Sequence, residues 1–284
     1  MKLINFITEN EARAGVLTCR GVIDLSLCGL PKSMEELISR WDRLKSAVED
    51  AVRNEALPAL DAEKLTFSPV THPARILCVG LNYKEHAAET HGEPPKEPAM
   101  FCKMPSCAAG HLEKIPVPKS ARKLDYEAEL VIIIGKYAYN VPASDAQSYI
   151  FGYTCGNDVS ARDAQFRSTQ WLIGKSLPKF APTGPVIVTA DELDVSDLAI
   201  ECRVNGELRQ SARTSDMSFS PTEIVAYVSQ FIELEPGDQI FTGTPAGVIV
   251  GMEKGKRVYL RAGDTMSVTI EGIGCLTNSF AEEG

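Results

Sequence analysis

The stretch "LDYEAELVIIIG", residues 124–135, decides the fold. Its second half, "VIIIG", has the apolar composition of a strand inside a sheet. Side chains alternate between the faces of a strand, so Glu127 and Glu129 point the same way. Two carboxylates so close repel each other unless one holds a proton or a cation lies between them. The stretch therefore predicts an apolar strand with two acids at its mouth, placed either on a solvated face or around a cation.

The length, net charge, apolar runs and cysteines of the chain limit the classes of protein to which it can belong. Its 284 residues can bury a large core, in one large domain or in a small and a large one. A net charge of -9 without a basic block argues against nucleic acid as a partner. The N-terminus lacks the apolar run of a signal peptide, and no stretch approaches a membrane span. Eight scattered cysteines without a CxxC motif predict free thiols and a cytoplasmic protein, rather than disulfides or zinc.

The pattern of strand-like and helix-like segments changes near residue 70. We therefore place a small N-terminal domain at residues 1–70 and a larger domain at residues 71–284. Ser33 and Glu36 have the spacing of a capping box at the start of one helix. The apolar positions of this helix recur at helical period: Leu37, Trp41, Leu44 and Val48. The proline-containing segment "LTFSPVTHPARI" ends the first region.

The larger region consists of short β-rich runs with few helices. Asn205-Gly206 predicts a hairpin turn, because both residues accept the positive φ angles of a tight turn. Ser220 and Glu223 predict the capped start of a second helix. The expected buried face of this helix is Ile224, Val225, Val228, Phe231 and Ile232. Since strands and helices do not alternate regularly, the pattern excludes a doubly wound sheet and favours an α+β protein that is mostly β.

A third carboxylate accompanies the first two. Asp158 follows the apolar run "YIFGYTCGN" and is expected at a strand end. Alone, Asp158 could simply cap the next turn. Together with Glu127 and Glu129 it forms an all-oxygen site that suits Mg²⁺ or Mn²⁺ and not zinc.

Further candidates lie in three other segments. His86 and Glu89 are three residues apart, so on a helical turn they form either a general base with its carboxylate or a surface pair. Lys175 lies in an apolar stretch, where it would supply positive charge to a substrate, pair with a structural acid or face solvent. Thr244 lies on a turn that would bind an anion or serve the turn alone.

Five motifs occur in order: "GLNYKEHAAE", "DYEAELVIIIGK", "NDVSARD", "GKSLPKFAPTGP" and "TGTPAGV". Over residues 74–280 the chain resembles the fumarylacetoacetate hydrolase family. The resemblance implies a mixed β-sandwich roll behind a small N-terminal α/β domain, a homodimer, and a lid that carries the His–Glu dyad, expected within residues 84–97. The implied metal ligands are Glu127, Glu129 and Asp158. The implied catalytic residues are His86, Glu89 and Lys175. The implied substrate contacts are Lys103, Arg162, Gln165 and Thr244. The loop 104–111 departs from the family pattern.

The resemblance implies chemistry on a small 2-oxo acid through the enolate of a pyruvate-like fragment, with Mg²⁺ or Mn²⁺ as cofactor. The leading hypothesis is hydrolysis of a carbon–carbon bond in an acylpyruvate or related 2,4-dioxo acid. There His86, assisted by Glu89, takes a proton from water, and Lys175 neutralises developing charge. Decarboxylation of oxaloacetate and isomerisation of an unsaturated 2-oxo diacid use the same residues. A protein that only binds small acids is the rival outside enzymes.

Overall fold

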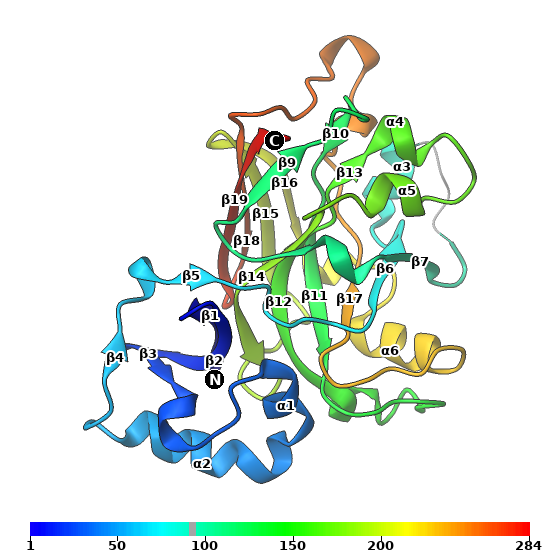
Figure 1. The fold of residues 1–284 in the computed structure, drawn as a ribbon. Helices are drawn as coiled ribbons and strands as arrows, with labels where there is room; N and C mark the ends of the chain where they lie inside the picture. The colour runs from blue at the N-terminus through cyan, green and yellow to red at the C-terminus, as the bar shows by residue number, and fades with distance from the viewer. Residues whose placement is uncertain (91–94) are drawn as a thin grey trace.

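The computed structural model describes residues 1–90 and 95–284. Two mixed β-sheets of twelve and five strands pack against each other, and short helices lie around their edges (Figure 1). The predicted α+β architecture, mostly β, is confirmed. No helix in the described ranges is both long and apolar enough to span a membrane.

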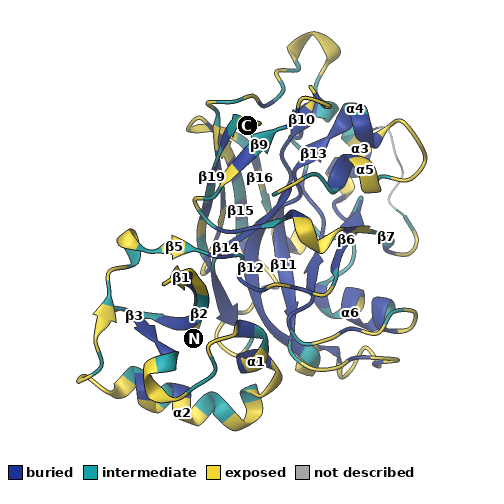
Figure 2. Ribbon diagram, viewed as in Figure 1, coloured by how far each residue is buried: buried dark blue, intermediate teal, exposed yellow. Residues whose placement is uncertain are grey.

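The first sheet carries the central strands of the molecule. Its order is β4-β3-β2-β1-β14-β12-β11-β17-β6-β7, with β5 beside β1 and β8 beside β14. The strands from the larger region are β6 (Ile76–Gly80), β7 (Ala99–Lys103), β8 (Ala108–Ala109), β11 (Ala128–Ile134), β12 (Ile150–Asn157), β14 (Ala181–Thr189) and β17 (Gln239–Phe241). Every residue of β11 and β12 is buried, as expected of a strand covered on both faces (Figure 2).

The second sheet has the order β16-β15-β18-β19-β9. Its strands are β9 (Lys114–Val117), β15 (Ala199–Val204), β16 (Glu207–Arg213), β18 (Thr265–Ile270) and β19 (Gly274–Glu282). The hairpin between β15 and β16 turns at Asn205 (φ 51°) and Gly206 (φ 82°), as predicted. A separate two-stranded ladder joins β10 (Leu124–Asp125) to β13 (Ser160–Ala161).

The N-terminal strands continue the first sheet. They are β1 (Lys2–Thr8), β2 (Glu11–Thr18), β3 (Gly21–Asp24), β4 (Ala59–Leu60) and β5 (Thr66–Phe67). β1 pairs with β14, with Leu3 opposite Ile187, so the backbone ladder crosses from one predicted domain to the other. The division near residue 70 stays a prediction.

The helices are short. They are α1 (Met34–Ser39), α2 (Trp41–Arg53), α3 (Lys84–Glu89), α4 (Arg162–Gln165), α5 (Leu172–Lys175) and α6 (Pro221–Ser229). The single helix expected after Ser33 is wrong, because Arg40 has a non-helical backbone between α1 and α2, and no glycine or proline marks this break in the sequence. The capping box of Ser220 and Glu223 is present on α6. Phe231 is 69% exposed, not buried as expected, because α6 ends before it.

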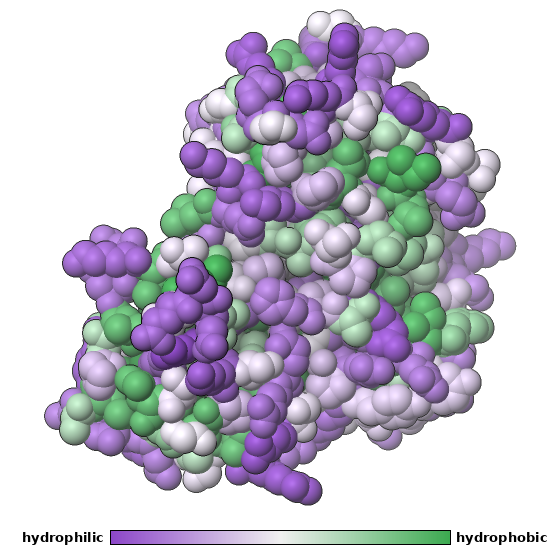
Figure 3. Space-filling view, viewed as in Figure 1, coloured by the Kyte–Doolittle hydropathy of each residue, from purple (hydrophilic) through white to green (hydrophobic). Residues whose placement is uncertain are grey.

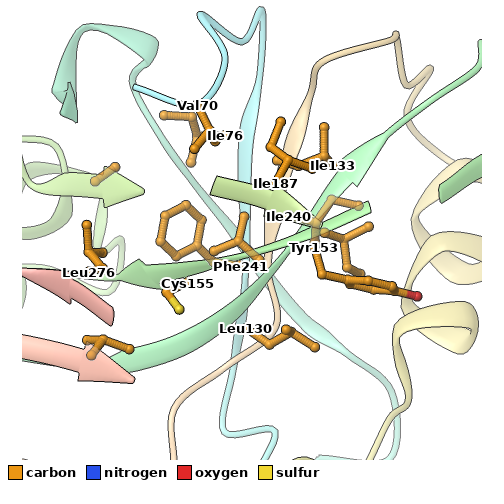
Figure 4. Close-up of a cluster of buried hydrophobic side chains, with 14 of the residues drawn as sticks. Val70, Ile76, Leu130, Ile133, Tyr153, Cys155, Ile187, Ile240, Phe241 and Leu276 are labelled. Atoms are coloured by element: carbon orange, nitrogen blue, oxygen red, sulfur yellow. The ribbon is translucent and has the colours of Figure 1, made fainter. Parts of the chain in front are cut away.

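The core fills the space between the two sheets. Leu130, Cys155 and Phe241 of the first sheet and Leu276 of β19 belong to one buried cluster (Figure 4). Burying a leucine or phenylalanine side chain contributes about 1.5–3 kcal/mol each. This core fixes β11 and β12, whose ends carry the predicted acidic residues.

Candidate active site

A cavity of about 370 Å³ opens where β10 passes into β11. The predicted residues that line it are His86, Glu89, Glu127, Glu129, Arg162, Gln165, Lys175 and Thr244. A larger crevice of about 670 Å³ follows α1 and α2 instead. Its charges largely neutralise each other, for example in the exposed pair of Lys45 with Asp191. The smaller cavity is therefore the candidate site.

The three predicted carboxylates converge, and two of them, Glu127 and Glu129, line the cavity, while Asp158 lies beside them outside its lining. The β11–β12 ladder sets Ala128 opposite Asn157, and the Asp158 N–H donates to the Glu127 carbonyl at 3.0 Å. One oxygen from each of Glu127, Glu129 and Asp158 lies within 4.8 Å of the others, and all three residues are buried. The structure thus brings together residues from two neighbouring strands, as the period of two and the strand-end position predict.

Three buried cations surround these acids. Lys175 Nζ donates to Glu127 Oε2 at 2.7 Å and to Asp158 Oδ2 at 2.6 Å. Arg162 Nη2 lies 2.6 Å from Glu127 Oε1, as an ion pair outside hydrogen-bond geometry. Lys103 Nζ donates to Asp158 Oδ1 at 2.5 Å. Hence Lys175 is neither exposed nor unpaired.

The electrostatics of the trio are uneven. Although burial disfavours its charged form, the charges of Lys175 and Arg162 hold the pKa of Glu127 below its ordinary value. Burial, followed by the charges of Asp158 and Glu127, raises the pKa of Glu129 well above its ordinary value. A divalent cation would relieve this repulsion, and clustered carboxylate oxygens are the donors that Mg²⁺ and Mn²⁺ prefer. The residues present fit such an ion.

The His–Glu dyad forms on α3, directly after the strand β6 and a short turn. His86 Nδ1 and Glu89 Oε1 are 2.9 Å apart, and His86 is only 7% exposed. Both oxygens of Glu89 accept from the Gly247 N–H, at 3.1 and 3.0 Å. A Cβ on Gly251 would lie 2.5 Å from Glu89 Oε2, so this position admits no side chain without displacing the carboxylate. Of the expected lid, residues 91–94 lie outside the described residues.

An aromatic wall faces the charged part of the cavity. The rings of Phe101 and Trp171 meet edge to face with centroids 5.2 Å apart, and Lys175 Nζ lies 5.1 Å from the Phe101 centroid. A Cβ on Gly80 would lie 2.8 Å from Trp171, so glycine leaves room for this ring. Phe166, which lines the cavity, and Ile173 of α5 are exposed, and Figure 3 shows hydrophobic side chains gathered beside α4 and α5.

The predicted substrate contacts divide into two groups. Arg162, Gln165 and Thr244 line the cavity. Lys103 does not: besides Asp158 it donates to the carbonyls of Val159 and Phe180, so it supports the acidic trio from behind. The divergent loop 104–111 contributes no residue to the cavity lining.

Asp125 was not singled out by the sequence pattern. Its carboxylate accepts from Arg162 Nε at 2.9 Å and from the N–H groups of Ile249 and Val250 at 2.9 and 3.0 Å. It thereby joins one wall of the cavity to Arg162. The signal was present, because Asp125 precedes Glu127 by two residues and continues the same alternation. Arg257 also lines the cavity, and no motif marks it.

Comparisons with known proteins relate this chain to one family. Residues 75–281 match the family model described as fumarylacetoacetate (FAA) hydrolase C-terminal. The oxaloacetate tautomerase Fahd2a, mitochondrial, of Rattus norvegicus is 40% identical over 263 residues, which are 91% of this chain and 83% of the relative. The fumarylacetoacetate hydrolase EaFAH from psychrophilic Exiguobacterium antarcticum matches with a TM-score of 0.87 and 37% identity, over 100% of both chains. The maleylpyruvate hydrolase from Sphingobium sp. SYK-6 in complex with manganese(II) ion and pyruvate matches with a TM-score of 0.83 and 29% identity, also over 100% of both chains.

These comparisons correct one expectation and establish the family. The predicted cytoplasmic location is wrong, because the rat relative is a mitochondrial protein by name. All eight cysteines are free, but free thiols do not distinguish one reducing compartment from another. With a family model matched over most of its length and a relative 40% identical, the chain belongs to the fumarylacetoacetate hydrolase family.

Proposed function

We propose that this chain catalyses the keto–enol tautomerisation of oxaloacetate or a closely related 2-oxo diacid, with Mg²⁺ or Mn²⁺ held by Glu127, Glu129 and Asp158. The observation that carries the proposal is that an acid–base dyad lines one small cavity together with Glu127 and Glu129, and that Asp158 lies within 4.8 Å of these two carboxylates. The rat tautomerase supports the choice of reaction, because it is 40% identical over 91% of this chain.

The chain's own residues account for the proton transfer. His86 Nδ1 forms a hydrogen bond with Glu89, so the other ring nitrogen, Nε2, is the one that can act on the substrate. His86 Nε2 takes a proton from C3 of the keto form and returns a proton to the oxygen on C2, and the reverse sequence restores the ketone. Glu127, Glu129 and Asp158 would hold a divalent cation, whose Lewis acidity would stabilise the negative charge that develops on C2–O. Lys175 orients Glu127 and Asp158 through its ion pairs with both carboxylates.

Hydrolysis of a 2,4-dioxo acid, the leading hypothesis from sequence, is the second candidate. The hydrolases from Exiguobacterium and Sphingobium support it, and there His86 would take its proton from water rather than from carbon. It ranks second because the relative with the higher identity is a tautomerase. The small 2-oxo acid partner and the homodimer remain predictions.

The deciding experiment uses protein stripped with EDTA and reloaded with Mn²⁺. Enol oxaloacetate is followed by loss of its ultraviolet absorbance, and acetylpyruvate by release of pyruvate. We expect wild-type protein to accelerate the loss of the enol absorbance and to release no pyruvate from acetylpyruvate. The rate of enol loss should fall by a factor on the order of 10²–10⁴ in His86→Gln. His72→Gln is the matched control, because His72 lies outside this cavity. A larger kcat/KM for acetylpyruvate would instead assign hydrolysis.

A further inference from the structure

Arg257 differs from the other cations that line the cavity in its partners. Arg162 and Lys175 each contact two buried carboxylates, at distances of 2.6 to 2.9 Å. Within residues 1–90 and 95–284, no carboxylate oxygen lies within 4.0 Å of the Arg257 nitrogens. Arg257 therefore brings a positive charge to the cavity that the described acidic residues do not neutralise.

The side chain of Arg257 is held in place. Its Nε donates to the Met252 carbonyl at 2.8 Å, and the residue is half-buried. This bond uses one edge of the guanidinium and leaves both Nη groups, whose fork matches a carboxylate in two parallel hydrogen bonds. Because the stem is already anchored, little conformational freedom remains to be lost when an anion binds.

The arrangement of the cavity gives this charge a specific use. Of the acidic trio, Glu129 lies in β11, Glu127 directly precedes β11 and Asp158 directly follows β12, while Phe101 and Trp171 form the aromatic wall. Arg257 comes from the segment between the 3₁₀ turn Ile249–Gly251 and β18. Under the proposed function, the 2-oxo carboxylate end of the substrate binds at the trio. Among the described residues that line the cavity, Arg257 is then the cation that no described carboxylate neutralises and that a second carboxylate on the same molecule can meet.

We propose that Arg257 binds the distal carboxylate of a 2-oxo dicarboxylic acid and so makes the site selective for diacids over 2-oxo monocarboxylic acids. This inference rests on the proposed function, which places the 2-oxo end at the trio. It does not depend on which reaction follows, since it concerns recognition alone.

The test compares two four-carbon acids that differ only at the distal end: oxaloacetate carries a carboxylate where 2-oxobutyrate carries a methyl group. Their dissociation constants are measured by calorimetry on Mn²⁺-loaded wild-type protein, Arg257→Met and Lys254→Met. Lys254 is the matched control, because it is an exposed cation of the same segment outside the cavity lining. We expect Arg257→Met to weaken oxaloacetate binding on the order of 10- to 100-fold, as loss of a charged hydrogen-bonded pair does. Arg257→Met should bind 2-oxobutyrate as tightly as the wild-type protein does. Lys254→Met should bind both acids as tightly as the wild-type protein does.

Other outcomes overturn the inference. If Arg257→Met weakened the binding of both acids equally, Arg257 would have a structural role. If Arg257→Met bound oxaloacetate as tightly as the wild-type protein, Arg257 would not contact the substrate. Wild-type protein without preference for oxaloacetate would refute diacid selectivity outright. Failure of the proposed function is distinguishable: wild-type protein would then bind oxaloacetate without accelerating its tautomerisation, while the ratio of dissociation constants still decides the role of Arg257.

Discussion

Replacing Asp125 by asparagine tests whether this buried carboxylate joins Arg162 to the cavity wall. Oδ1 accepts from the N–H groups of Tyr126 and Ile249, both at 2.9 Å. Oδ2 accepts from Arg162 Nε at 2.9 Å and from the Val250 N–H at 3.0 Å. In asparagine an NH₂ group replaces one oxygen, so two of these four donors lose their acceptor whichever way the amide turns. Because the Arg162 guanidinium also loses one of its two carboxylate partners and keeps only Glu127 among the described acidic residues, the substitution should lower the free energy of unfolding by about 3–5 kcal/mol.

Urea unfolding at pH 7 measures this change, and hydrogen exchange at Ile249 and Val250 locates it. Whichever of these two amides faces the new NH₂ group should exchange faster in Asp125→Asn. Asp50→Asn is the matched control, since the Asp50 side chain forms an exposed ion pair with Arg53. Its unfolding midpoint should not move. A loss below about 1 kcal/mol in Asp125→Asn, the net value of one ordinary hydrogen bond, would refute the reasoning.

Three further predictions follow from the site and the core. Glu129→Gln should weaken Mn²⁺ binding at least about tenfold in calorimetric titration, because mutating even a residue that supports a metal ligand lowers the metal affinity by that factor. Unchanged affinity would show that Glu129 is not a ligand. Gly251→Ala should displace Glu89 and lower kcat while Mn²⁺ affinity is retained, and an unchanged kcat would show that the dyad tolerates the shift. Burial lowers the pKa of His111 to about 4, and its Nδ1 accepts from the Thr277 N–H at 3.0 Å. As pH falls, His111 is therefore protonated at a higher pH in the unfolded chain than in the folded one. The free energy of unfolding should therefore decrease between about pH 6.5 and pH 4, and less so in His111→Gln; equal slopes in urea unfolding would contradict this.

The acidic trio could be predicted because each of its members follows a local rule. Glu127 and Glu129 share a face through the period of two, and Asp158 ends the strand that pairs with theirs. His86 and Glu89 meet through helical spacing on α3. In each case the backbone geometry of one element, or of two paired strands, fixes the relation between the side chains.

Other parts of the site depend on long-range packing that no local period records. Arg257 lies in a lysine-rich segment that resembles an exposed loop, and only the fold brings it to the cavity. Lys103 belongs to a family motif position, yet it lies behind Asp158 because three acceptors there bind its ammonium group. In the fold, the break at Arg40 carries no glycine or proline signal. Such features follow from tertiary contacts that override local preference.

The ladder between β1 and β14 bears on how this chain can be shortened. A protein that begins near residue 71 would keep every residue of the candidate site but would uncover the hydrogen-bonding edge of β14 at Ile187 and Val188. Bare edges of apolar strands recruit strands from other molecules, so such a fragment should aggregate even with its cavity intact. Exchange of the first 70 residues with those of a relative should succeed where the Leu3–Ile187 register is kept, whatever side chains face the solvent.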